Sequence, residues 1–279
     1  MFNIKNILII FFLTFGFSNQ WIGIRSDEPV KPEISLIESN NENSIVSLEL
    51  SGFSLNSTII NDSEYFSVKF PLSASIMEEG HPDLPKYSSS IIVSDNKSMS
   101  VEILSSNFID YENINIIPSK GNLSRLINPD DIPYIFDEIY KEDVFYPNNI
   151  VQLNEPYILR DYRGQVVEFH PVQYNPVTKV LRIYTDIEVE VSSNDNNIVI
   201  NPLNRERELT AIDNEYKNIY SNHFLNFENE NTRFEYLVDQ GNMLIISDGN
   251  FMSEMQPLID WKNKKGIPTE IVNVSTIGS

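Results

Sequence analysis

The side chains that could do chemistry in this sequence are few and lie far apart. The chain of 279 residues contains no cysteine, so it offers no thiol nucleophile, no disulfide and no thiolate metal site. Its three histidines, His81, His170 and His223, are widely separated and stand in unlike sequence contexts. The sequence therefore holds few side chains that could act as catalytic groups. We expect each histidine to be a turn or surface residue.

Adjacent carboxylates are the remaining candidates for a site. Glu78-Glu79 and Asp130-Asp131 resemble acid pairs or calcium ligands. The sequence has no twelve-residue loop with alternating Asp or Asn and a terminal Glu, as an EF-hand requires. Because the chain holds forty acidic residues, adjacent pairs are expected by chance. We therefore assign no metal ion and no cofactor.

The charge balance limits the kinds of partner. Forty acidic residues against twenty basic ones give a formal net charge of −20. Such a chain repels phosphate and offers few cationic contacts, which argues against a nucleic-acid partner. Apolar residues make up 41% of the sequence, enough to bury the core of one large domain or two ordinary ones.

The N-terminus has the layout of a secretory signal peptide. Lys5 supplies a positive start, and residues 7–17 form an apolar run that is short for a transmembrane helix. Gly16 and Ser18 are small residues at the −3 and −1 positions of a cut after Ser18. We expect residues 1–18 to be removed, which leaves a secreted, periplasmic or cell-surface protein without a membrane span. The alternative is an uncleaved N-terminal anchor.

A β pattern fills most of the chain. Residues 19–43 are polar with two prolines, which indicates a loose leader. Apolar and polar residues alternate over 65–70 and 181–191, and short β-rich runs occur at 45–50, 90–93 and 101–104. Residues 158–191 predict a three-strand meander with a turn at 162–164. The pattern therefore predicts a β-sandwich domain over residues 44–203.

Residues 115–149 interrupt this pattern. They carry four prolines, at positions 118, 129, 133 and 147, with aromatic residues between them. We interpret the stretch as a long loop with short helical or extended pieces. Long loops inside a compact domain are usually functional or mobile.

The spacing of apolar residues changes after Pro202. Residues 209–227 carry apolar side chains at intervals of three and four, which predicts an amphipathic helix followed by a polar linker, together spanning 204–240. A buried-type strand at 243–246, a helix at 251–265 and a strand at 269–274 then predict a βαβ unit within residues 241–279. We expect Trp261 to anchor this helix on its sheet, and we expect a truncated α/β domain because the next helix is due where the sequence stops.

The C-terminal segment resembles the opening of the gingipain (C25) family of cysteine peptidases. The stretch Asp260-Trp-Lys-Asn-Lys-Lys-Gly266, with strands on both sides, carries the likeness. Upstream, Glu79-Gly-His-Pro-Asp-Leu-Pro85, residues 157–163 and residues 172–176 resemble the propeptide of that family. The resemblance implies a β-sandwich propeptide followed by the first βαβ of a caspase-like domain. The His and Cys of the family's catalytic dyad would lie beyond this chain, so no catalytic residue is assigned.

The resemblance also implies a role. A propeptide of this kind inhibits its own downstream peptidase domain and assists its folding, so that the activated thiolate does not act before export. Members of the family cut after Arg or Lys, and a basic propeptide side chain can occupy the specificity pocket. The candidates are Lys120, Arg125, Lys141, Arg160 and Arg163. Each could instead be an ordinary surface cation, and Arg160 and Arg163 could equally pair with carboxylates.

Activation in this family requires a processing peptidase that cuts after a basic residue. Arg233 lies in the polar linker about ten residues before the first strand of the α/β unit, the spacing that the resemblance implies. Arg205 and Arg207 are the alternatives. All three could instead simply pair with nearby glutamates.

Two other functions remain open from sequence alone. One is a non-enzymatic secreted β-sandwich, such as an adhesin or a carbohydrate-binding module, which would present a row of exposed aromatic residues on one sheet face. The other is the same precursor in an inactive, degenerate form.

Overall fold

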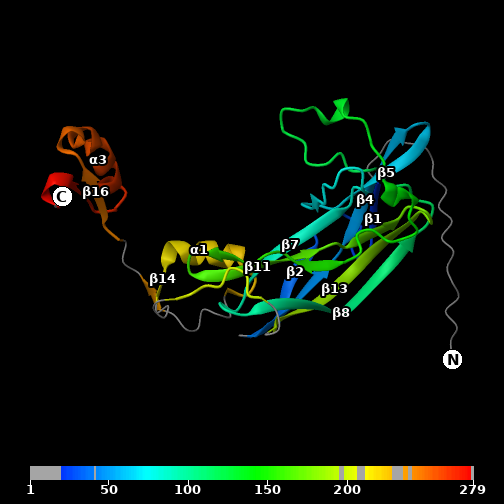
Figure 1. Cartoon of the computed structure of the whole chain (residues 1–279), viewed down its shortest axis with the longest axis horizontal. Coiled ribbons are helices and arrows are strands. Elements are labelled where there is room, and N and C mark those ends of the chain that lie inside the picture. Colours follow the sequence, from blue (N-terminus) through cyan, green and yellow to red (C-terminus); the bar gives the residue numbers. More distant parts are fainter. Residues whose placement is uncertain are drawn as a thin grey trace. The chain divides into compact units, whose positions relative to one another are not determined.

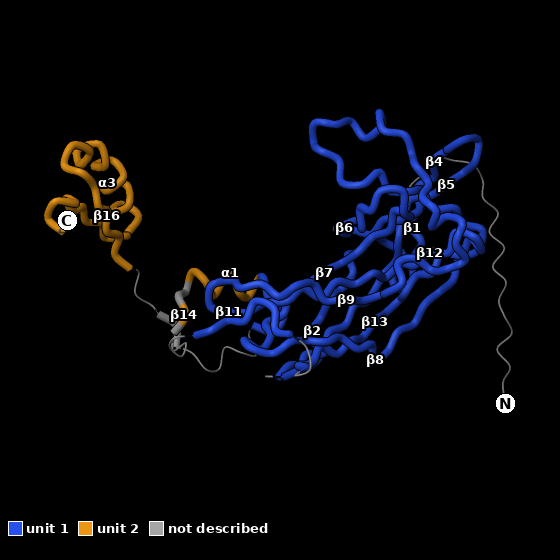
Figure 2. The backbone as a smooth tube through the Cα atoms, viewed as in Figure 1, with its two compact units in different colours: residues 1–206, 223–230 blue, residues 207–222, 231–279 orange. Residues whose placement is uncertain are grey.

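The computed structural model describes residues 20–40, 42–194, 198–205, 211–227, 235–237 and 241–277. Antiparallel strands dominate the fold (Figure 1). The chain divides into two compact units (Figure 2). The first contains residues 1–206 and 223–230, and the second contains residues 207–222 and 231–279.

The smallest sheet of the first unit has the order β1-β4-β5. Its strands are β1 (Gln20–Gly23), β4 (Gly52–Ile60) and β5 (Ser63–Lys69). Asn61 and Asp62 form the two-residue turn between β4 and β5, both with positive φ angles of 48° and 61°. Asn and Asp tolerate this left-handed conformation better than other non-glycine residues, which explains their place in the hairpin.

The second sheet is built around β11. It contains β6 (Ala74–Ser75), β7 (Pro85–Ile92), β9 (Val151–Leu153), β10 (Tyr157–Leu159) and β11 (Tyr162–Phe169). Strand β11 pairs with β7 on one side and with β9 and β10 on the other. Nearly every residue of β11 is buried, including its polar ones.

The third sheet is built around β13, the longest strand. It contains β2 (Glu33–Ser39), β3 (Asn43–Glu49), β8 (Ser98–Tyr111), β12 (Val172–Asn175) and β13 (Val180–Asn194). Apolar residues of β13 are buried at alternate positions, as strand geometry requires. These are Leu181, Ile183, Ile187, Val189 and Val191.

The three sheets share one hydrophobic core. Fully buried side chains from all three contribute to it, among them Leu48, Phe53, Ile91, Phe169 and Val189. Each such side chain contributes roughly 1.5–3 kcal/mol when it is removed from water. The prediction of a mainly β fold is confirmed, and the structure builds it from several antiparallel sheets.

Two sequence-based expectations for this unit are wrong. The loose leader at 19–43 contains strands β1 and β2, which pair with β4 and β3, and its prolines fall in the connection between them. The meander over 158–191 does not form either. Its turn lies at residues 160–161, and the chain passes from one sheet to another at His170-Pro171, where proline cannot donate a ladder hydrogen bond.

The stretch 115–149 is irregular, as the prolines predict. It contains two short 3₁₀ helices, η1 (Pro129–Asp131) and η2 (Glu138–Lys141). Isolated bridges join it to β5 at Ile116 and to β12 at Tyr146, and a third bridge pairs Pro118 with Pro82. The loop is therefore held at several points along its length.

The predicted helix after Pro202 is shorter than expected. Helix α1 spans Asn214–His223, and Ala211–Asp213 forms strand β14, which pairs in parallel with β15 (Glu235–Leu237). Phe224 and Phe227 fit the helical spacing but lie beyond the helix end, and both are buried. Residues 223–230 belong to the first unit.

The predicted βαβ unit is present. Strands β16 (Met243–Ser247) and β17 (Thr269–Asn273) are parallel, and they are joined by η4 (Gly249–Phe251), η5 (Ser253–Met255) and α3 (Gln256–Lys264). A last 3₁₀ turn, η6, spans Val274–Thr276. Trp261 does not anchor the helix as expected. Its side chain is 48% exposed, with the Lys265 ammonium 4.3 Å from its ring centroid.

Several predicted features lie outside the described residues. These are the signal segment with its cut after Ser18, and the two arginines Arg207 and Arg233. Among the residues described, no helix is long and apolar enough to cross a bilayer.

Candidate functional site

A loop from Lys120 to Asp137 projects from the first unit and is visible as the green loop at the top of Figure 1. Three of its large apolar side chains are turned to solvent. Leu126 is 96% exposed, and Ile127 and Ile135 are also exposed. Water-exposed apolar side chains gathered on one segment are typical of a surface that binds a partner. We therefore take this loop as the candidate site.

The tip of the loop is a hydrogen-bonded turn. The amide of Ile127 donates to the Ser124 carbonyl oxygen at 3.0 Å, and the amide of Leu126 donates to Ser124 Oγ at 3.4 Å. Arg125 and Leu126 are the two central residues of this turn. Arg125 is exposed, and none of the described carboxylates forms an ion pair with it.

The two arms of the loop are tied together below the tip. Lys120 Nζ donates to the Pro129 carbonyl oxygen at 2.8 Å and lies 4.1 Å from the centroid of the Tyr134 ring. Burial raises the pKa of Tyr134, and the charges of Asp83 and Asp130 raise it further. The phenol therefore stays neutral at physiological pH beneath the lysine.

Aromatic packing fixes the outgoing arm to the sheets. The Phe136 ring lies 5.3 Å from the Tyr65 ring and 4.8 Å from the Tyr140 ring, between centroids. The Tyr140 hydroxyl donates to the Ile116 carbonyl oxygen at 2.9 Å. Contacts of this kind limit the conformations of a loop and favour a preorganised binding segment.

The five basic candidates for an inhibitory side chain are not gathered in one place. Lys120 is engaged inside the loop, and Lys141 pairs with Glu138 at 2.8 and 3.0 Å. Arg160 occupies the turn before β11 and lies 3.7 Å from Asp161. Arg125 alone among the five is both exposed and without a described ion-pair partner.

Arg163 is a structural residue, which corrects its place among those candidates. It is fully buried, and its guanidinium donates to four main-chain carbonyl oxygens. The acceptors are Ser94 at 2.6 Å, Lys97 at 2.8 Å, Ile200 at 2.8 Å and Asn201 at 3.0 Å. The sequence suggested a turn at this position, but Arg163 lies within strand β11, and its side chain is buried.

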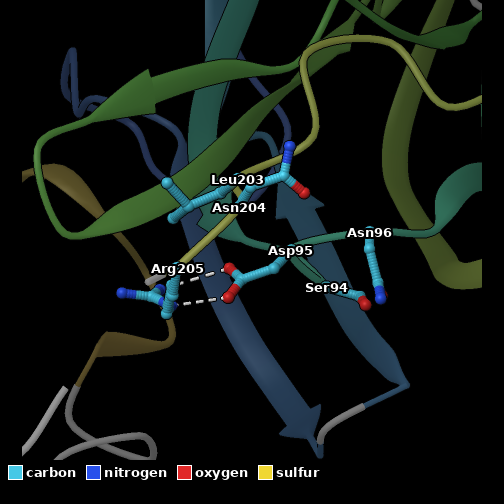
Figure 3. Close-up of a pocket in the computed structure, with 6 residues that line it drawn as sticks. All are labelled: Ser94, Asp95, Asn96, Leu203, Asn204 and Arg205. Carbon is cyan, nitrogen blue, oxygen red and sulfur yellow. Dashed lines mark hydrogen bonds and ion pairs between the residues drawn. The ribbon is translucent and has the colours of Figure 1, made fainter. Parts of the chain in front are cut away.

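Arg205, an alternative cleavage site, is held by Asp95. The two side chains form a double ion pair, with Nε–Oδ2 at 2.6 Å and Nη2–Oδ1 at 3.2 Å (Figure 3). The Leu203 amide also donates to the Asp95 carbonyl oxygen at 2.8 Å. An open hollow of about 480 Å³ surrounds this pair, lined by Ser94, Asp95, Asn96, Leu203, Asn204 and Arg205.

The three histidines do not assemble a catalytic centre. His170 is neither a turn nor a surface residue as expected: it lies between β11 and β12 and is buried. Its Nδ1 is 2.9 Å from the Asn149 carbonyl oxygen, and its Nε2 is 3.1 Å from Glu168 Oε1. His223 Nε2 lies 2.6 Å from the Tyr157 hydroxyl. His81 is near Glu78, whose carboxylate accepts from the Tyr146 hydroxyl at 2.7 Å. Within the described part of the chain, no group of three or more His, Asp or Glu side chains could hold a metal ion.

Comparison with known proteins gives consistent matches. The family model Propeptide_C25 matches residues 26–234. Gingipain R2 of Porphyromonas gingivalis (strain ATCC BAA-308 / W83) is 41% identical over 216 residues, covering 75% of this chain and 28% of that protein. Gingipain R1 of Porphyromonas gingivalis is 39% identical over 206 residues, covering 73% and 20%. The chain thus spans less than a third of the length of these curated relatives.

Two solved structures share the fold. A complex of Porphyromonas gingivalis RgpB pro- and mature domains matches with a TM-score of 0.65 and 38% identity, covering 71% of this chain and 98% of that chain. A structure on zymogenic latency of gingipain K from Porphyromonas gingivalis matches with a TM-score of 0.52 and 21% identity, covering 63% and 99%. The second likeness is at the level of the fold alone.

Proposed function

Because this chain belongs to the C25 (gingipain) propeptide family, we propose that its β domain inhibits a downstream gingipain-like cysteine peptidase domain and assists the folding of that domain. Proteolysis after a basic residue then removes the propeptide. The observation that carries the proposal is the projecting loop with Arg125 at the tip of its turn.

Arg125 is the best candidate for the inhibitory side chain. An arginine at the tip of a turn can enter a pocket while the rest of its domain stays outside. Its planar guanidinium can donate two parallel hydrogen bonds to a carboxylate at the bottom of such a pocket. The exposed neighbour Leu126 would then supply apolar contact area beside the pocket.

The loop is also suited to inhibition because it is ordered before binding. The hydrogen bond from Lys120 to Pro129 and the packing of Phe136 reduce the conformational entropy that the loop loses when it binds the peptidase domain. A preorganised loop therefore binds more tightly than a free segment of the same sequence.

The rival function, a carbohydrate-binding module, has little support. Such a module needs several exposed aromatic rings on one face. Among the described strand residues of the first unit, Phe108 is the exposed aromatic residue, and the guanidinium carbon of Arg182 lies 3.9 Å from its ring centroid.

We propose Arg233 as the activation site. The propeptide family match ends at residue 234, directly after it, and the alternative Arg205 is engaged by Asp95. Incubation of the chain with a trypsin-like peptidase should give a new N-terminus at Phe234, and this product should be absent from Arg233→Ala. We further propose cleavage of the signal segment after Ser18 and a site of action outside the cytosol.

Inhibition can be measured directly. The 279-residue chain is titrated into the mature domain of RgpB, and hydrolysis of an arginyl substrate is followed. We expect stoichiometric or dose-dependent inhibition with a constant of about 1 μM or tighter, as for specific protein interfaces of standard size. Full peptidase activity at a tenfold molar excess of the chain would overturn the proposal.

A further inference from the structure

Both ends of the projecting loop meet at one glycine. The amide of Gly80 donates to the Ser119 carbonyl oxygen at 3.0 Å, and the amide of Asp137 donates to the Gly80 carbonyl oxygen at 3.1 Å. Ser119 directly precedes the loop, and Asp137 ends it. A single residue from outside the loop thus fixes the separation of its two arms.

Residues next to Gly80 extend this junction along the incoming arm. The Ser119 amide donates to the His81 carbonyl oxygen at 2.7 Å, and the Asp83 amide donates to the Ile117 carbonyl oxygen at 2.9 Å. Pro82 and Pro118 form an antiparallel bridge between these bonds. Segment 80–83 therefore pairs with segment 117–119 as a short strand would.

The junction is tight, and its backbone angle favours glycine. Gly80 has a φ of +79°, and a Cβ at this position would lie 3.1 Å from Asp137 Cβ and 3.3 Å from Asp137 N. A side chain here would be strained by its backbone angle and would push against the outgoing arm. Gly121, on the other arm, has a φ of +75°, and a Cβ there would lie 3.2 Å from Glu79 Cβ.

We propose that Gly80 is a positioning residue for inhibition, which clamps both arms of the loop and so sets how Arg125 is presented to the peptidase domain. This inference rests on the inhibitory role proposed above. It also gives a function to the Glu79–Pro85 motif, whose residues 80–83 pair with the start of the loop. The clamp acts through the main chain of the loop, so Gly80 need not touch the peptidase.

Loss of the clamp should weaken inhibition without removing any contact group. A loop held by fewer hydrogen bonds samples more conformations, so it loses more conformational entropy when it binds the peptidase. We expect Gly80→Ala to raise the inhibition constant against the RgpB mature domain roughly tenfold, equivalent to about 1.4 kcal/mol. Hydrogen exchange of the peptide covering residues 120–137 should become faster.

Two further variants make the test specific. Asp137→Pro removes the donor to the Gly80 carbonyl at a position whose φ of −77° proline can adopt. It should act in the same direction as Gly80→Ala. Gly266→Ala is the matched control, since Gly266 has nearly the same φ, +80°, but lies in the other unit. It should leave both loop exchange and inhibition unchanged.

Separate results would contradict the Gly80 clamp and the inhibitory function of the domain. Unchanged loop exchange in both Gly80→Ala and Asp137→Pro would overturn the clamp. Faster exchange with an unchanged inhibition constant would overturn its role in presenting Arg125. A parent chain that does not inhibit at all would overturn the proposed function itself, whatever the exchange of the loop shows.

Discussion

The side-chain amide of Asn226 bonds to both main-chain polar groups of Ile92. Asn226 Oδ1 accepts from the Ile92 amide at 2.7 Å, and Nδ2 donates to the Ile92 carbonyl oxygen at 2.9 Å. One buried side chain therefore completes the main-chain hydrogen bonds of Ile92 at the end of β7, as a neighbouring strand would. Phe224 and Phe227 pack on Tyr162 beside it. The segment just before the proposed activation site is thus part of the β domain.

Asn226→Asp should destabilise the β domain strongly. A carboxylate still accepts from the Ile92 amide but cannot donate to the Ile92 carbonyl. The side chain is 1% exposed, so a buried negative charge would face that carbonyl oxygen with no hydrogen between them. We expect a loss of about 2–4 kcal/mol in the free energy of unfolding, measured with urea. Asn222→Asp, at an exposed position, is the control. Equal stability of the two variants would contradict this account.

Arg163→Lys should also destabilise the domain, by at least about 3 kcal/mol. A lysine ammonium keeps the charge but cannot reach four carbonyl oxygens in the geometry of the guanidinium fork. The comparison is Arg160→Lys, three residues earlier in an exposed turn, which should change stability by less than about 0.5 kcal/mol. Similar urea midpoints for the two variants would show that Arg163 is not a structural cross-link.

Asp95→Ala should make the bond after Arg205 easier to cut. The double ion pair holds Arg205 against the domain, and its loss should speed trypsin cleavage of the Arg205–Glu206 bond roughly five- to tenfold, or about 1 kcal/mol. Mass spectrometry of timed digests identifies this product. Glu42→Ala, which breaks the nearby pair with Lys97, serves as the control. An unchanged cleavage rate in Asp95→Ala would mean that the Asp95–Arg205 ion pair does not protect the Arg205–Glu206 bond.

Glu168 should make the domain sensitive to acid. Burial alone would raise its pKa, but hydrogen bonds from Lys86 and Gln152, the charge of Lys86 and a bond to His170 outweigh burial, so the pKa lies below its ordinary value. A carboxyl with a lowered folded-state pKa stabilises the protein above its unfolded-state pKa of about 4.3. That stabilisation is lost as pH falls through the folded-state value.

Glu168→Gln tests this pH dependence. The variant should be less stable than the parent at pH 7, and the difference should shrink as pH falls from about 5 towards 3. Urea midpoints at several pH values provide the measurement. A difference that stays constant over this range would exclude Glu168 as the source of the acid sensitivity.

Regular alternation of apolar and polar residues was sufficient to predict several of the strands. It identifies β5 and β13, where one side of each strand faces the core. It misses most of β8, because Ser105, Ser106 and Asn107 interrupt the apolar pattern in the middle of the strand. That strand forms because the long partner β13 pairs with it over its whole length, which is a tertiary effect.

Sequence patterns did not predict which charged side chains are buried. Arg163 is buried because carbonyl oxygens from two distant segments surround it, and Glu168 is buried because Lys86 from another strand reaches it. The four prolines do predict the long loop. They do not distinguish Arg125 from the other basic residues, because that distinction depends on which of them has an ion-pair partner.

The measurement that tests the central claim most directly compares three chains as inhibitors of the RgpB mature domain: the parent, Arg125→Ala and Lys141→Ala. Lys141 lies in the same long connection and is also exposed, but it pairs with Glu138. If the Arg125 side chain fills the specificity pocket, Arg125→Ala should raise the inhibition constant by about 30-fold or more, equivalent to about 2 kcal/mol, while Lys141→Ala matches the parent. An Arg125→Ala chain that inhibits as well as the parent would contradict this account.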